Sequence, residues 1–260
     1  MSPGTLWLVP TPLDFGTLDG GRPAPDLREV LPMGTLRAAA GLTHWVVENA
    51  KTARAFLKRV HAVVPLAQPL QSLQIHELPR PPKGQRGAAP ALPDALLRPA
   101  LQGLDMGLMS EAGMPAVADP GAELVRRAQA LGLTVTPLVG PSALLLALAA
   151  SGLNGQSFAF VGYLPVDEAA RAARIRELEG LSRRLGQTQL MIETPYRNAA
   201  LFHALLQHLQ PTTWLSVASG LTLEDGWNHS APVVQWREGL GLAARRAPAD
   251  RPTVFALLAR

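Results

Sequence analysis

The segment from Leu108 to Leu153 constrains the fold more than any other part of this 260-residue chain. It begins in one short apolar run, GLM, and contains a second, TVTPLV; each is followed by a Gly/Pro-rich turn and then a helical pattern. Strands that alternate with helices predict an α/β sheet, in which ligands bind beyond the carboxyl ends of the strands. The two turns, AGMPAVADPG and LVGPSA, are therefore the first candidates for a ligand site.

Periodicity predicts further elements on both sides of this segment. Strands and helices alternate up to about Val135, whereas the second half is richer in strands and partly antiparallel. We therefore expect two α/β subdomains, residues 1–137 and 143–260. The many prolines of residues 65–93 predict an irregular loop. Strands are predicted at residues 6–10, 43–47, 134–138, 158–161, 189–192, 214–218, 233–236 and 253–258. Helices are predicted at residues 48–60, 122–131 and 198–209, and an arginine-rich helix is predicted to end at about residue 185.

Composition excludes several classes of site. The chain has no cysteine, so disulfides, thiolate metal sites and a cysteine nucleophile are excluded. Its six histidines show no metal-binding spacing, and the GxGxxG, GxxxxGK[ST] and GxSxG patterns are absent, so we expect no metal site. The N-terminus lacks the pattern of a signal peptide, and the most apolar window, SALLLALAA, is too short to span a bilayer. We expect a cytoplasmic protein without membrane spans, with this window as a buried helix.

The basic residues gather in two groups, although the formal net charge is only +4. A solvated helix face and a phosphate-contacting patch are both compatible with such groups. The first group is Arg171, Arg174, Arg176, Arg183 and Arg184, and the second is Arg245, Arg246 and Arg251.

Five Gly/Pro loops follow apolar strands and could converge on one crevice. They are PTPLD, SEAGMPAVADPG, VGPSA, GYLP and ETPYR. In this order the chain resembles the tetrapyrrole methylase superfamily, and within it the subgroup that methylates a cytidine ribose 2′-O of small-subunit ribosomal RNA. That subgroup typically shows S-D-A-G-T-P-x-x-x-D-P-G, P-L-P-G-P-S/C-A, F-x-x-x-G-F-L-P and E-S-P/T-H-R. The resemblance extends from about Leu6 to Trp236.

The resemblance implies two α/β domains with S-adenosylmethionine in the cleft between them, usually in a homodimer. It also implies that the cofactor is bound largely through backbone atoms, which agrees with loops rich in Gly, Ala, Pro and Val. By motif position, the cofactor-binding residues would be Pro12, Leu13, Gly113, Met114, Val117, Ala118, Ser142, Ala143, Ile192, Ala218, Pro252 and Thr253.

Three of these residues have a second interpretation. Val117 and Ala118 are also compatible with core packing. The Ser142 hydroxyl, at the start of an apolar helix, could cap that helix instead of meeting a ligand. Gly113, at a strand-to-loop transition, suits close approach of the backbone to a ligand.

Positions on the acceptor side depart from the subgroup pattern. TPLDFGTLD stands where T-P-I-G-N-L-x-D is usual, and ENAKTA, with Asn49 and Lys51, replaces E-D-T-R-x-T. Lysine does not replace arginine where a bidentate contact is needed. Tyr196 stands where histidine is usual, and ASGLTLED at 218–225 replaces A-R-E-x-T-K-x-x-E.

The leading hypothesis is an S-adenosylmethionine-dependent methyltransferase that acts on ribosomal RNA. A hydroxyl acceptor would need a proton acceptor within hydrogen-bond reach. Two alternatives stay open: a small-molecule or tetrapyrrole methylase, and a non-catalytic cofactor-binding paralogue with a regulatory role. No catalytic residue is assigned, and the candidates are Glu48, Glu111, Glu193 and Arg197.

Overall fold

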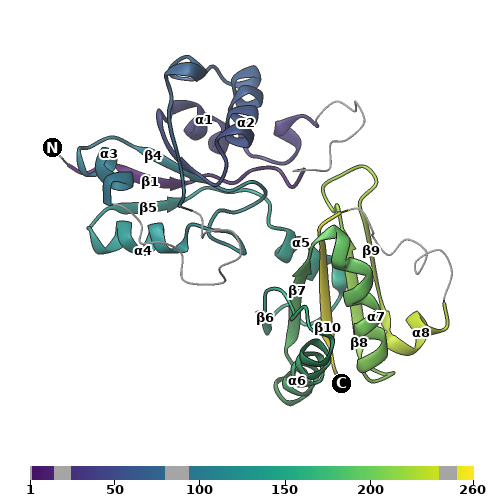
Figure 1. The fold of residues 1–260 in the computed structure, drawn as a ribbon. Coiled ribbons are helices and arrows are strands. Elements are labelled where there is room, and N and C mark those ends of the chain that lie inside the picture. The colour runs from purple at the N-terminus through teal and green to yellow at the C-terminus, as the bar shows by residue number, and fades with distance from the viewer. Residues whose placement is uncertain (1, 15–24, 80–93, 240–250) are drawn as a thin grey trace. The chain divides into compact units, whose positions relative to one another are not determined.

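A computed structural model describes residues 2–14, 25–79, 94–239 and 251–260. The chain divides into two compact units, Met1–Pro141 and Ser142–Arg260 (Figure 1). Each unit contains a five-stranded sheet with helices packed against it. The α/β class predicted from the sequence is therefore confirmed.

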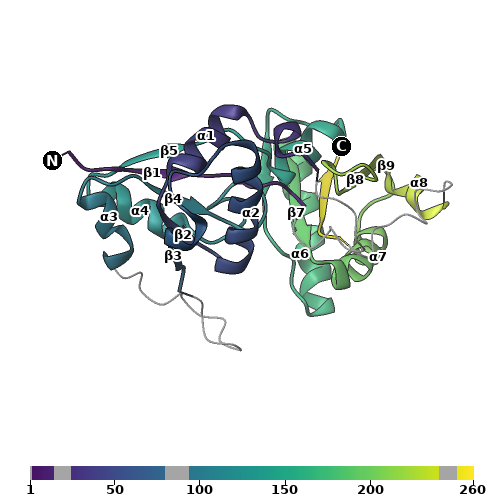
Figure 2. The same cartoon turned by 90° about the horizontal axis from the view of Figure 1, so that it is seen from above.

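The sheet of the first unit is entirely parallel. Its strand order is β3-β2-β4-β1-β5, and Figure 2 shows β3 beside β2 at one edge. Because every strand runs the same way, all five carboxyl ends meet at one edge of the sheet. The strands are β1 Thr5–Leu8, β2 His44–Val47, β3 Gln74–Glu77, β4 Met106–Met109 and β5 Thr134–Pro137.

Helices cover both faces of this sheet. The helices α1 (Met33–Gly41) and α2 (Ala50–Val63) pack on one face, and α3 (Arg98–Leu101) and α4 (Ala122–Ala130) pack on the other (Figure 1). The chain leaves β1 through α1 toward β2, and leaves the adjacent β4 through α4 toward β5. The connections from β1 and β4 thus run in opposite directions along the sheet, one on each face, and such a reversal is the kind of switch point where α/β sheets bind ligands.

The sheet of the second unit is mixed. Its order is β6-β7-β10-β8-β9, in which only β6 and β7 pair in parallel. The central β10 comes from the end of the chain and is buried over most of its length. The strands are β6 Phe158–Phe160, β7 Thr188–Glu193, β8 Trp214–Ser219, β9 Trp227–Pro232 and β10 Thr253–Leu258.

Two helical layers enclose the second sheet. The helix α5 (Ala143–Ser151) packs on one face against Ala218, Val254 and Ala256. The opposite face carries α6 (Glu168–Leu185), α7 (Asn198–His208) and α8 (Val233–Arg237), around a core that includes Phe202, Trp236 and Phe255. Short 3-10 helices at Leu27–Glu29, Leu70–Ser72, Asp94–Leu97 and Pro195–Arg197 complete the described elements.

Two amphipathic helices agree with their sequence pattern. In α2, the apolar side chains of Ala53, Phe56, Leu57 and Val60 are all buried. In α4, Leu124 and Ala128 are buried, and Val125 and Leu131 pack against the same cluster. The 3.6-residue period thus predicted which face of each helix meets the sheet.

Three other predictions are wrong in part. Residues 65–93 are predicted as irregular, but Gln74–Glu77 forms β3. The side chains of β3 are mostly exposed, so the strand shows no apolar alternation that a sequence pattern could reveal. Residues 80–93 lie outside the described part. Residues 233–236 belong to a helix, because Val233 and Trp236, three apart, both face the core. The helix α5 is buried on one side only, since it packs on a single sheet face and Leu145 stays 56% exposed.

None of the helices within the described residues combines the length and the apolarity that crossing a bilayer requires.

Candidate functional site

A two-residue bridge joins the loops that follow β1 and β4. The amide of Thr11 donates to the Gly113 carbonyl at 3.0 Å, and the amide of Gly113 donates to the Thr11 carbonyl at 3.1 Å. The bridge lies at the carboxyl edge of the first sheet, beyond the adjacent strands β1 and β4. It brings the predicted residues Pro12 and Leu13 beside Gly113 and Met114.

Gly113 occupies a position that no larger residue fits easily. Its φ is +80°, and a Cβ built on it would lie 3.0 Å from Leu13 Cδ2 and 3.4 Å from the Pro141 carbonyl oxygen. At the neighbouring Gly140, a Cβ would lie 2.3 Å from Pro10 Cγ. The glycines therefore let their own backbones lie close to side chains of the loop after β1 and to the Pro141 carbonyl.

The loop between β4 and α4 holds two alanines in the left-handed region. Ala116 has φ +65° and Ala118 has φ +64°, values that cost a residue with a Cβ about 1–2 kcal/mol. Val117 between them is 46% exposed, and Ala118 is also exposed. The core-packing interpretation of Val117 and Ala118 is therefore wrong. Strained, exposed backbone of this kind is typical of ligand-binding loops.

Replacing Ala116 by Gly is expected to raise the free energy of unfolding by about 0.5–1 kcal/mol, because glycine adopts a positive φ without a Cβ clash. The greater conformational freedom of glycine in the unfolded chain offsets part of this gain. Urea unfolding followed by tryptophan fluorescence measures the change. The matched control is Ala130→Gly at the end of α4, where the backbone is helical and the same substitution should destabilise. Equal losses at both positions would contradict the strain argument.

Two of the candidate bases meet at this edge. The Glu48 carboxylate, after β2, accepts a hydrogen bond from the Glu111 amide at 3.3 Å. The Thr52 hydroxyl in α2 lies 3.2 Å from Glu111 Oε1 and 3.0 Å from the Asn49 carbonyl oxygen. Glu111 Oε2 has no partner among the residues that the structure describes. Glu111 thus combines a held oxygen with an available one.

A third carboxylate, Asp119, lies in the same loop. Burial raises the pKa of the Asp119 carboxyl, the nearby Ser110 hydroxyl opposes the rise, and the Glu111 carboxylate adds to it. Ser110 is only 5% exposed, and within the described part of the chain its Oγ has no hydrogen-bond partner of standard geometry. Sequence reasoning singled out neither residue, although both belong to the SEAGMPAVADPG motif or adjoin it.

The changed ENAK segment keeps its structural role. Asn49 is the N-cap of α2, and its side chain accepts from the amides of Lys51 and Thr52 at 2.9 and 3.4 Å. Glu77 Oε1 accepts the Ala50 amide at 2.7 Å. Asparagine caps a helix about as well as aspartate, so this substitution leaves the helix start intact.

The predicted residues of the second unit gather around the start of α5. Ala143 and Ile192 pack against the cluster that contains Ala218 and Val254, and Val254 pairs in register with both Ile192 and Ala218. Ser142 is the N-cap residue of α5, but its side chain makes no capping hydrogen bond. The capping interpretation of the Ser142 hydroxyl is therefore wrong.

Thr253 is the first residue of β10, and Pro252 precedes it. The Ser219 hydroxyl donates to the Pro252 carbonyl at 3.3 Å, and the Thr253 hydroxyl donates to the Arg251 carbonyl at 3.1 Å. The Arg251 guanidinium makes two contacts with Asp225, at 2.7 and 2.5 Å, so the altered ASGLTLED segment supplies a partner that fixes the start of β10.

Glu193 and Arg197 bind each other. Arg197 Nη2 lies 2.8 Å from Glu193 Oε2, and Glu193 is buried with its side chain 1% exposed. Glu193 Oε1 also accepts the Thr194 amide at 2.8 Å, while Arg197 donates to the Leu164 carbonyl at 3.0 Å. This pair joins the ETPYR and GYLP loops. Because both carboxylate oxygens of Glu193 have partners, Glu193 is poorly suited to act as a base. Tyr196, in the same loop, is 83% exposed.

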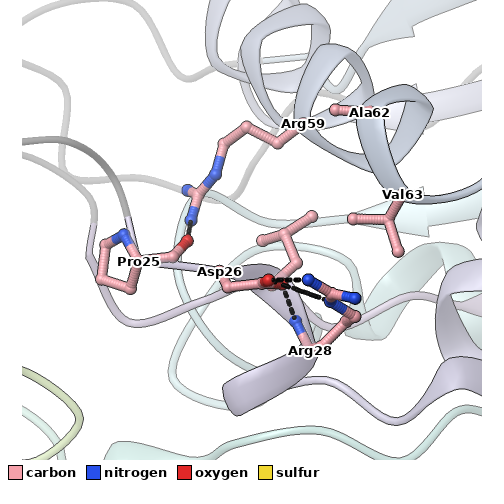
Figure 3. Close-up of a pocket in the computed structure, with 7 residues that line it drawn as sticks. Pro25, Asp26, Arg28, Arg59, Ala62 and Val63 are labelled. Carbon is pink, nitrogen blue, oxygen red and sulfur yellow. Dashed lines mark hydrogen bonds and ion pairs between the residues drawn. The ribbon is translucent and has the colours of Figure 1, made fainter.

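A separate pocket of about 420 Å³ lies between the first 3-10 helix and α2 (Figure 3). Its charged groups are paired: Arg28 with Asp26, and Arg59 with Asp14 at 2.7 Å and with the Pro25 carbonyl at 3.0 Å. The bidentate contact with Arg28 lowers the pKa of Asp26 to about 2. Arg59 thus holds Asp14, next to Leu13, and the charged side chains described in the pocket lining are all paired. No group of three or more metal-ligating side chains occurs in the described ranges.

Comparison with known proteins places this geometry in context. The family model of the tetrapyrrole (corrin/porphyrin) methylases matches residues 39–226. The ribosomal RNA small subunit methyltransferase I of Xylella fastidiosa is 33% identical over 177 residues, which cover 68% of this chain and 55% of that protein. The protein of the same name from Vibrio cholerae is 42% identical over 97 residues, 37% of this chain and 32% of its own. The matched part thus spans about half of the first relative and a third of the second.

Two solved structures share the fold. The methyltransferase CobJ matches with a TM-score of 0.56 and 15% identity, covering 100% of both chains. The uroporphyrin-III-C-methyltransferase of Thermus thermophilus matches with a TM-score of 0.51 and 16% identity, covering 98% of this chain and 94% of that one. At these identities the likeness concerns the fold alone.

Proposed function

Because the chain belongs to the tetrapyrrole (corrin/porphyrin) methylase family, we propose that it is an S-adenosylmethionine-dependent methyltransferase that acts on ribosomal RNA at a ribose 2′-hydroxyl. The observation that carries the proposal is its similarity to curated ribosomal RNA small subunit methyltransferases, at 33–42% identity over the matched segments.

The residues present fit a cofactor held mainly by backbone groups. The Thr11–Gly113 bridge, and the 3.0 Å that would separate a Cβ at Gly113 from Leu13 Cδ2, support a binding surface in the first unit that is made largely of main-chain atoms. The start of α5, which lacks a side-chain cap, offers amide donors in the second unit. Pro12, Leu13, Gly113, Met114, Val117 and Ala118 would bind from the first unit, and Ser142, Ala143, Ile192, Ala218, Pro252 and Thr253 from the second.

When bound, S-adenosylmethionine supplies an electrophilic methyl group. The protein's own part is to hold the acceptor hydroxyl in line with that group and to take its proton. We propose that Glu111 Oε2 accepts this proton. Thr52 orients the Glu111 carboxylate through Oε1, and the Glu48 carboxylate accepts a hydrogen bond from the Glu111 amide. Glu193 is excluded from this role by its pairing with Arg197.

Replacing Gly113 by Ala is expected to weaken S-adenosylmethionine binding at least about tenfold, ~1.4 kcal/mol, because the new Cβ displaces Leu13 and strains the backbone. Isothermal titration calorimetry measures the dissociation constant. The matched control is Gly132→Ala, whose φ of +74° carries the same strain but whose Cβ meets nothing within 4 Å. Equal affinity losses in both variants would place Gly113 outside the cofactor site.

The proposed function is tested in two steps. Calorimetry with S-adenosylmethionine and S-adenosylhomocysteine should detect binding, and no binding would overturn the proposal. Mass mapping of ribosomal RNA from a strain lacking the gene should reveal a lost ribose methylation that the purified protein restores. An unchanged modification map would remove ribosomal RNA as the acceptor, and transfer to a tetrapyrrole instead would favour the small-molecule alternative.

The family likeness also supports two finer proposals. We propose that the protein functions as a homodimer and in the cytoplasm, where ribosomal RNA is modified. Sedimentation equilibrium at micromolar protein concentration would test the first of these proposals.

A further inference from the structure

The described arginines of the two basic groups noted in the sequence fall into two sets. Those of the first set stabilise the fold, since buried Arg171 donates to the Val166 carbonyl at 2.8 Å, Arg174 pairs with Glu177 at 2.7 Å, and Arg251 pairs with Asp225. Arg245 and Arg246 lie outside the described residues. The second set, Arg176, Arg183 and Arg184 of α6, is exposed and has no carboxylate partner among the residues described.

These three arginines form one basic surface, which we call the α6 surface. Arg176 and Arg183 are seven residues apart, so they lie on the same stripe of the helix about 10 Å from each other. Arg184 lies on the neighbouring stripe. The helices α6 and α7 lie side by side on the sheet (Figure 1), and Arg176 Nη2 is 3.3 Å from His208 Nδ1 at the end of α7.

The acidic residues of α6 do not neutralise this surface. Glu177 is engaged by Arg174. Glu179 is buried and serves the loop before β8, where it accepts the Gln210 amide at 2.8 Å and the Thr213 hydroxyl. Glu168 lies in the first turn, two turns from Arg176. The helix therefore pairs or buries its nearby acids and leaves three guanidinium groups in solvent.

We propose that the α6 surface binds the phosphate backbone of the RNA acceptor. The inference rests on the proposed function, which makes RNA the partner that three exposed guanidinium groups without a described carboxylate partner would meet. Arginine binds phosphate through several donors at once, and phosphate contacts position a nucleic acid without reading its sequence. The α6 surface therefore contributes affinity for RNA, while the acceptor hydroxyl is selected at the methyl-transfer site.

The test is the triple variant R176Q/R183Q/R184Q, with fluorescein-labelled oligouridine as the probe in anisotropy titrations at several salt concentrations. Each phosphate contact to a single strand contributes about −0.7 to the slope of log K against log salt. The slope of the variant should therefore be shallower by about 2, with weaker binding at low salt. The matched control is R37Q/R98Q/R126Q, which removes three exposed arginines without carboxylate partners from the described part of the first unit.

Equal slopes for the two triple variants would overturn the proposal, because net charge alone would then explain the loss. The proposal would also be wrong if the wild-type protein bound no oligouridine. It would be wrong as well if the triple α6 variant lost binding to anionic lipid vesicles but kept its binding to RNA. The variant R176K/R183K/R184K keeps the charge and should keep the salt slope of the wild type, with weaker binding because lysine lacks the several donors of arginine. Calorimetry with S-adenosylmethionine should be unchanged in all variants, which separates failure of the α6 surface from failure of the proposed function.

Discussion

Replacing Glu111 by Gln is expected to lower kcat for methyl transfer to a hydroxyl acceptor about 10²–10⁴-fold, the usual contribution of a general base. The dissociation constant of S-adenosylmethionine should stay within about twofold, because the substitution keeps the Thr52 contact at Oε1 and the backbone contact with Glu48. Single-turnover methylation of RNA measures the chemical step separately from cofactor binding.

The physical reason is the arrangement of charge at the carboxyl edge of the first sheet. Glu48, Glu111 and Asp119 gather there, and burial with the nearby Glu111 charge raises the pKa of Asp119. Asp119 therefore stays protonated to a higher pH than an ordinary aspartate. Glutamine at 111 retains the shape but cannot accept a proton.

Two comparisons make this prediction specific. The matched control is Glu77→Gln, which removes the same charge from the same unit but keeps an oxygen for the Ala50 amide, so kcat should be unchanged. The competing candidate is tested by Glu48→Gln. If that variant loses kcat as strongly as predicted for Glu111 while Glu111→Gln remains active, the proton acceptor is Glu48 and our assignment is wrong.

The sequence predicted the elements that bury a regular apolar pattern. The apolar faces of α2 and α4 followed from a 3.6-residue period, and the central strands followed from short apolar runs. The edge strand β3 was missed because its side chains are mostly exposed, and β9 because WNHSAP contains few apolar residues.

The site was predictable only where a motif marked it. The motif positions around Gly113 lie together because Thr11 pairs with Gly113, a contact between distant parts of the chain that no local pattern reveals. The partners of polar side chains were equally hidden. The ETPYR motif does not predict that its glutamate and arginine bind each other. The ASGLTLED segment likewise does not predict that Asp225 binds Arg251.

Breaking the Glu193–Arg197 ion pair is expected to have a large effect on stability. Replacing Arg197 by Met is expected to lower the free energy of unfolding of the second unit by about 3 kcal/mol, because it leaves the Glu193 carboxylate buried without its cation. The Leu164 carbonyl also loses its donor. Urea unfolding followed by tryptophan fluorescence measures the loss, and three of the five tryptophans, Trp214, Trp227 and Trp236, belong to this unit.

The double variant E193Q/R197M separates a structural pair from a catalytic one. It should recover most of the lost stability, to within about 1 kcal/mol of wild type, because a neutral amide can still accept the Thr194 amide without carrying a buried charge. The matched control is Arg174→Met, which breaks an exposed ion pair and should cost less than about 0.5 kcal/mol. If R197M unfolds like the wild type but no longer transfers methyl groups, the pair belongs to the catalytic site, and the structural role argued from its burial is wrong.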